Sequence, residues 1–68
     1  MVEGEQAARD AVRASDAERG LVVERLARAM EHGRLSAVEY DDRVAAAYAA
    51  TTRGELSHLT KDLPGHLW

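Results

Sequence analysis

Apolar residues recur at helical spacing in three stretches of this 68-residue chain, and polar segments separate them. The first stretch contains Leu21, Val22, Leu26, Ala29 and Met30. The second contains Tyr40, Val44, Ala47 and Tyr48, and the third contains Leu56, Leu59 and Leu63. Apolar residues three and four positions apart fall on one face of an α-helix. The pattern therefore predicts helices over residues 16–31 and 37–50, and a short helix that ends near residue 62.

Each predicted helix is preceded by a capping box, in which a hydroxyl residue is followed three positions later by glutamate. The three pairs are Ser15 with Glu18, Ser36 with Glu39, and Thr52 with Glu55. The hydroxyl oxygen accepts a hydrogen bond from the glutamate N–H, and the carboxylate accepts one from the N–H of the hydroxyl residue. Caps and apolar stripes agree, which indicates that local sequence specifies all three helix starts.

The turn between the first two helices carries its own signals. Gly33 can adopt the left-handed backbone that ends a helix, which a residue with a Cβ adopts only at a cost. Leu35 follows two positions later and is placed to pack between the two helices. Short connections favour antiparallel neighbours. The sequence therefore predicts an all-α fold, a small bundle of three short helices.

The two ends of the chain lack such a pattern. Residues 1–13 contain few large apolar side chains, and short helices without packing partners are marginal in water. Pro64 ends the third helix, because proline disfavours helical backbone in the residue before it. We therefore expect a flexible N-terminal lead-in over residues 1–13, a helical domain over 14–64 and a tail over 65–68. For Trp68 three interpretations stay open: an exposed anchor, the start of a membrane segment, or a frayed end.

Composition limits what this chain can bury and bind. The apolar content is largely alanine, with two Tyr, one Trp and no Phe, so a single thin core is expected. Small cores often need assembly for stability, which predicts a homo-oligomer or a complex with another protein. There is no cysteine, so disulfides and thiolate metal sites are excluded. The formal net charge of −3 disfavours nucleic acid as a partner, because such domains usually carry a basic face.

Several short motifs occur in the order found in a known family. They are Arg13-Ala14-Ser15-Asp16-Ala17, Arg25-Leu26, Gly33-Arg34-Leu35-Ser36, Glu39-Tyr40-Asp41-Asp42-Arg43, Thr52-Arg53-Gly54-Glu55-Leu56 and Asp62-Leu63-Pro64. On these motifs the chain resembles the actinobacterial SHOCT-like domain of unknown function 1707. The resemblance implies a short helical module, usually near the N-terminus of its protein and often followed by transmembrane or accessory segments. It implies no established activity.

Any membrane-spanning segment would therefore have to belong to a longer protein that contains this chain. No apolar run in this chain approaches the roughly 20 residues of a membrane-spanning helix, and residues 1–10 lack the pattern of a signal peptide. Either the chain is a stand-alone version of the family or it is a soluble piece of a longer protein. We expect a cytoplasmic location, at the cytoplasmic face of the membrane if a membrane segment follows.

No constellation of residues predicts catalysis, a cofactor or a metal. The three capping hydroxyls are already explained, and His32, His58 and His66 are too scattered for a compact metal site. His58 and Asp62 lie four positions apart on the predicted third helix and could share a metal or a proton. A solvated pair, or a contact of His58 with the helix dipole, is the favoured interpretation. We therefore expect no catalytic, cofactor-binding or metal site and no enzymatic activity.

The leading hypothesis is a non-catalytic protein–protein interaction or oligomerisation module. The residues expected to carry its packing are Leu35, Tyr40, Val44, Tyr48, Leu56 and Leu59. Both tyrosines are expected in the core or an interface, with the hydroxyl at the edge. Arg43 lies at the margin of the second stripe. It either bonds Asp16, Asp41 or Asp62 within the chain or anchors a partner and sets specificity.

The alternative is a helix-turn-helix-like DNA-binding or regulatory protein. Two short helices joined by a turn that contains glycine are compatible with that motif, and the arginines offer phosphate contacts. Against it, Glu39, Asp41 and Asp42 crowd the second helix, where base contacts would be needed. An enzyme ranks third, because the chain is small for a substrate pocket.

Overall fold

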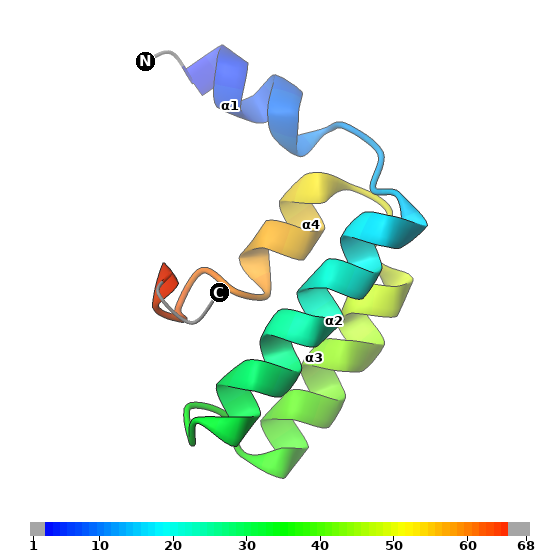
Figure 1. Ribbon diagram of the computed structural model, residues 1–68. Helices are drawn as coiled ribbons and strands as arrows, with labels where there is room; N and C mark the ends of the chain where they lie inside the picture. Colours follow the sequence, from blue (N-terminus) through cyan, green and yellow to red (C-terminus); the bar gives the residue numbers. More distant parts are fainter. Residues whose placement is uncertain (1–2, 66–68) are drawn as a thin grey trace.

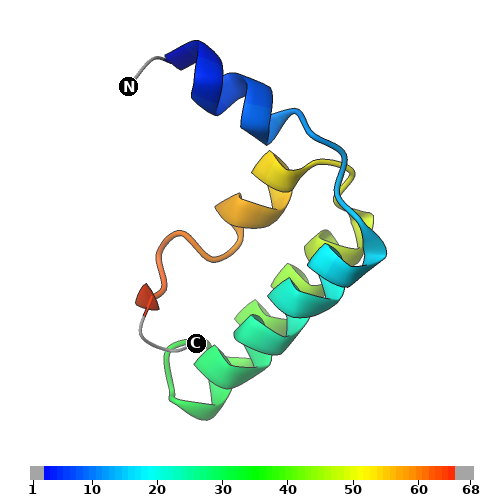
Figure 2. The same ribbon diagram turned by 45° about the horizontal axis from the view of Figure 1, so that its top comes forward.

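A computed structural model describes residues 3–65 of the chain, with side chains from residue 7 onward. Its helices are α1 (Glu3–Asp10), α2 (Asp16–Glu31), α3 (Ala37–Ala49) and α4 (Arg53–His58). Helices α2 and α3 lie side by side and run antiparallel, α4 packs against α2, and α1 lies beyond the start of α4 (Figures 1 and 2). The all-α fold and the three predicted helices are confirmed.

The structure differs from the predicted element bounds at two places. Helix α1 lies within residues 1–13, where a lead-in without stable structure was expected. Helix α4 ends at His58 rather than near residue 62. The N–H groups of Leu59 and Thr60 bond carbonyls three residues back, at 3.0 and 3.3 Å. Such bonds tighten the chain into 3₁₀-type turns and end the α-helical ladder.

The segments before α2 and before α4 pair with each other. Arg13 and Thr52 form an isolated antiparallel bridge, flanked by bonds from Ala14 N–H to the Thr51 carbonyl and from Arg53 N–H to the Val12 carbonyl. Gly54 permits the close approach of α1, because a Cβ there would lie 2.8 Å from the Asp10 Cβ. Helix α1 is positioned by this contact with α4, whereas the sequence of residues 1–13 did not predict a stable helix.

The core lies where α2, α3 and α4 meet. Its buried members are Val22, Leu26, Ala29, Leu35, Ala47, Ala50 and Leu56. Leu26 is the largest fully buried side chain among the described residues. The small side chains at the α2–α3 contact let these helices approach closely, and all members of the buried cluster come from this one chain.

Two residues of the predicted stripes lie outside this core. Leu21 is 46% exposed and Tyr48 is 64% exposed, so neither belongs to the core of the chain, and of the two places predicted for Tyr48, core or interface, the structure excludes the core. Each directly neighbours a buried residue, Val22 or Ala47, and adjacent residues of an α-helix point about 100° apart. The buried faces of α2 and α3 therefore each contain one residue fewer than the apolar spacing predicted.

The turn after α2 has the predicted form. Gly33 has a φ of +75°, in the left-handed region. Its N–H donates to the Met30 carbonyl at 3.0 Å, and the Arg34 N–H donates to the Ala29 carbonyl at 2.9 Å. These two bonds form a Schellman motif. Leu35 follows and is buried, so it closes the end of the core as expected.

Candidate functional site

All three predicted capping boxes are formed. In the first, the Ser15 N–H donates to the Glu18 carboxylate at 2.8 Å, and the Glu18 N–H donates to the Ser15 hydroxyl at 3.0 Å. The boxes that begin α3 and α4 have the same reciprocal bonds. Hydrogen bonds to the charged form lower the pKa of each capping glutamate, chiefly from the N–H of Ser15 or Ser36 and, for Glu55, from the Thr51 hydroxyl.

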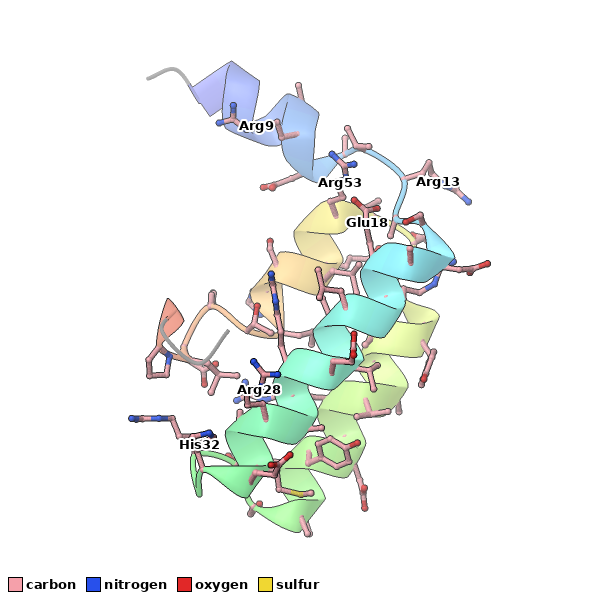
Figure 3. The ribbon with its side chains drawn as sticks, in the orientation of Figure 1. Arg9, Arg13, Glu18, Arg28, His32 and Arg53 are labelled. Atoms are coloured by element: carbon pink, nitrogen blue, oxygen red, sulfur yellow. The ribbon has the colours of Figure 1, made fainter. Side chains whose placement is uncertain are left out.

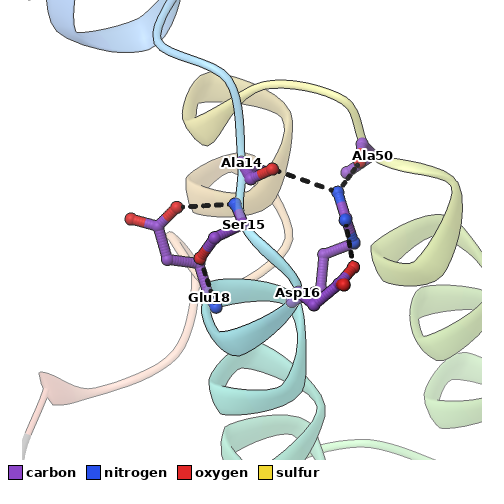
Figure 4. Close-up of polar contacts among 6 residues, drawn as sticks. Ala14, Ser15, Asp16, Glu18 and Ala50 are labelled. Atoms are coloured by element: carbon purple, nitrogen blue, oxygen red, sulfur yellow. Dashed lines mark hydrogen bonds and ion pairs between the residues drawn. The ribbon is translucent and has the colours of Figure 1, made fainter.

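The first turn of α2 is joined to the end of α3 and to the start of α4, and Figure 4 shows the contact with Ala50. The Arg19 guanidinium donates to the Ala50 carbonyl at 2.9 Å and to the Ala14 carbonyl at 3.3 Å, and it pairs with Asp16. On the other side, the Arg53 Nε lies 2.6 Å from the Glu18 carboxylate. The bonds from Arg19 to Ala50 and from Arg53 to Glu18 cross between elements distant in sequence, so no local pattern could have identified them.

Arg43 is held within the chain. Its two terminal nitrogens donate to the two Asp62 carboxylate oxygens at 2.7 and 2.9 Å, and one also donates to the Leu59 carbonyl at 3.0 Å. A bidentate pair of this kind is strong and directional. The Arg43 guanidinium lowers the pKa of Asp62, and Asp62 raises that of Arg43. Of the three partners left open by the sequence, the structure selects Asp62, which fastens the segment after α4 to α3.

The other candidates for chemistry are accounted for structurally. His58 is the last residue of α4 and Asp62 lies beyond it, so the two do not share one helix face. The Asp62 carboxylate is bound by Arg43. Across the part of the chain that is described, no group of three or more His, Cys, Asp or Glu could hold a metal ion. His66 and Trp68 lie outside the described residues.

The residues predicted to carry packing divide into two sets. Leu35 and Leu56 are buried, and Tyr40, Val44 and Leu59 are partly buried against the core. Tyr48 belongs instead to an exposed face of α3, which we name the α3 outer face. Its members are Val38, Asp41, Asp42, Ala45, Tyr48 and Ala49. Val38 is 70% exposed, so a large apolar side chain reaches solvent at each end of this face.

A second surface feature is a groove of about 220 Å³ between α2 and α4, which we name the α2/α4 groove. Its floor is formed by Val22 and Leu56, with the half-exposed Leu21 at its edge. Arg25, Arg53 and the Glu18 carboxylate that pairs with Arg53 also line it. Arg28 follows one turn later on α2, and its side chain points toward the segment after α4 (Figure 3). Sequence reasoning missed this groove, because it depends on how α4 lies against α2.

The helix arrangement bears on the DNA-binding alternative and on membrane insertion. In a helix-turn-helix motif the two helices cross at roughly 90–120°, whereas α2 and α3 run antiparallel and side by side (Figure 1). Glu39, Asp41 and Asp42 are exposed on α3. Among residues 3–65, none of the helices has both the length and the apolar character needed to cross a bilayer.

The capped helices define a small all-helical module, and comparison with known proteins assigns its family. The family model of the DUF1707 SHOCT-like domain matches residues 12–64, so the chain belongs to this family and the predicted resemblance is confirmed. Similar curated proteins are two uncharacterised Mycobacterium tuberculosis proteins, MT0994 from strain CDC 1551 / Oshkosh and Rv0966c from strain ATCC 25618 / H37Rv. Each is 52% identical over 56 residues, covering 82% of this chain but 28% of the relative. No solved structure matches.

Proposed function

We propose that this domain is a non-catalytic interaction module that self-associates through the α3 outer face. The observation that carries the proposal is the exposure of Val38 and Tyr48, at 70% and 64%, on one side of a helix that is capped at its start. Tyrosine is enriched at protein interfaces, because it supplies a large apolar ring with a polar end. The small Ala45 between them, and Ala49 next to Tyr48, let another element approach the helix closely.

The packing of the chain supports a surface role for this face. The core forms within one chain, so the α3 outer face is not needed to hold α2, α3 and α4 together. The matched region covers 28% of each of these relatives, which suits a module that joins larger chains. We place this module in the cytoplasm, at the membrane surface where the longer protein has a membrane segment.

Light scattering coupled to size-exclusion chromatography tests this proposal over a wide range of protein concentrations. The wild type is expected to exceed its monomer mass of 7.4 kDa as concentration rises. The double variant Val38→Ser/Tyr48→Ser is expected to stay monomeric. Val12→Ser is the matched control, because Val12 is also exposed but lies outside α3. A wild type that is monomeric at every concentration would refute the proposal.

A further inference from the structure

The α3 outer face has the residue spacing of a contact line between two helices. Its central line contains Val38, Asp42, Ala45 and Ala49, which are separated by four, three and four positions and are all exposed. This alternating spacing is typical of the line along which paired helices touch. We infer that two copies of this chain pair along these lines with their α3 helices antiparallel, as a closed two-fold dimer. This inference rests on the proposed self-association and specifies its geometry.

The distribution of charge along α3 favours the antiparallel direction. The exposed acidic residues Glu39, Asp41 and Asp42 all lie in its first half, whereas residues 45–49 carry no charge. A parallel pair would place each carboxylate beside its own counterpart, and like charges across a contact disfavour association. Antiparallel helices instead place the acidic half of one copy against the uncharged half of the other.

Arg13 adds a positive charge at the end of α3 that receives the acidic half of the second copy. Its backbone pairs with that of Thr52, shortly after α3 ends, and its side chain is exposed and extends away from the ribbon (Figure 3). In the antiparallel dimer, the Asp41 end of each copy therefore approaches the Arg13 end of the other. Opposite charges at the rim of a contact favour encounter and fix its register.

The spacing also determines which residues face each other. Val38 of one copy lies opposite Ala49 of the second copy, and in the same register Asp42 lies opposite Ala45. The small alanine leaves room for the Asp42 carboxylate to extend to solvent, so no charge is buried without a partner. Because both helices contribute the same residues, the contact is isologous and closes at two copies.

This register gives the exposed Tyr48 a polar partner. Tyr48 and Asp41 are seven positions apart, so they lie on the same flank of the contact line. The two-fold axis brings the same flank of both helices together, which places Tyr48 of one copy near Asp41 of the other. The tyrosine hydroxyl is then placed to donate to the carboxylate, while the ring lies against apolar atoms.

Cysteine cross-linking tests the register, because the chain contains no cysteine of its own. Val38→Cys and Ala49→Cys are prepared separately and mixed in an oxidising thiol buffer. Cysteine behaves as a small apolar residue, so both variants keep the contact line. In the antiparallel dimer the two different sites lie opposite each other, whereas two copies of the same site lie about 17 Å apart along the helices. A disulfide requires Cα atoms within about 7 Å. The mixture is therefore expected to form at least about tenfold more cross-linked dimer than either variant alone.

Val12→Cys is the matched control for cross-links that form by random encounter, because Val12 is exposed but lies outside α3. Mixed with Val38→Cys, it is expected to stay at the level of either variant alone, and light scattering checks that each reduced variant self-associates like the wild type. Equal cross-linking in each variant alone and in the mixture would indicate parallel pairing and overturn the inference.

Two further results separate the inference from the proposed function. If the wild type self-associates but the mixture cross-links no better than the control, the proposed function stands and the antiparallel dimer is refuted. The wild-type mass is expected to level off at twice 7.4 kDa, and continued growth with concentration would also refute the closed dimer. A monomeric wild type would overturn the inference together with the proposed function.

Discussion

Replacing Leu26 by alanine is expected to remove a large part of the stability of this domain. Leu26 is fully buried on α2, within the cluster formed by α2, α3, α4 and the turn that carries Leu35. Alanine would leave a cavity at the point where these elements meet. Helix capping and the surface ion pairs do not compensate for it, because they lie at the ends and edges of the helices.

The expected loss is about 3 kcal/mol or more, the range found when a buried leucine becomes alanine. Domains are stable by roughly 0.05–0.15 kcal/mol per residue, which for a chain of this size gives about 3–10 kcal/mol. The substitution therefore removes a third or more of the total. In a domain of this size each 1 kcal/mol lowers Tm by about 4–8 °C, so the expected decrease is at least roughly 12 °C.

Urea and thermal unfolding followed by circular dichroism measure this loss. Leu21→Ala is the matched control, because it removes the same atoms from the same helix at a residue that is 46% exposed. It is expected to cost less than about 1 kcal/mol. Equal destabilisation by the two substitutions would refute the assignment of Leu26 to the core and of Leu21 to the surface.

Four further predictions concern helix packing, the Arg43–Asp62 pair and the helix caps. Gly54→Ala places a Cβ 2.8 Å from the Asp10 Cβ, so it should displace α1 and speed amide hydrogen exchange in α1. Gly20→Ala is the contrasting substitution, because its Cβ meets no atom within 4 Å, and it should stabilise the fold by up to about 1 kcal/mol. Unchanged α1 exchange in Gly54→Ala would contradict this. Arg43→Lys keeps the charge but loses the bidentate pair with Asp62, and should speed exchange in residues 59–63 while leaving α2 protected. Asp62 and the three capping glutamates have folded-state pKa values below their ordinary 3.8 and 4.5. Their contribution is therefore complete above about pH 5 and is lost as pH falls through the lower folded values, so the urea midpoint should fall between pH 5 and pH 3, and a constant midpoint would be inconsistent with these shifts.

The helix starts were predictable because their determinants are local. Ser15 and Glu18 cap the same turn in which they stand, and Gly33 ends α2 through its own backbone freedom. Helix α1 was not predictable in this way. Its docking depends on the absence of a Cβ at Gly54, more than forty positions after Asp10.

The surface features were harder to predict than the helices. Spacing alone placed Tyr48 in a stripe, but the burial of Ala47 and Ala50 turns that side chain to solvent. The α2/α4 groove requires α4 to lie against α2, which the Glu18–Arg53 pair between these helices helps to fix. In sequence, Arg25 and Arg53 resemble solvated surface charges, and only the fold brings both of them to the lining of this groove.

Sedimentation equilibrium of the wild type, with helicity measured at each concentration, tests self-association most directly. The proposed function predicts an average mass that rises above 7.4 kDa with concentration, while helicity stays constant because the core forms within one chain. A mass of 7.4 kDa across the whole range would contradict self-association. Helicity that is lost on dilution would contradict a core completed by a single chain.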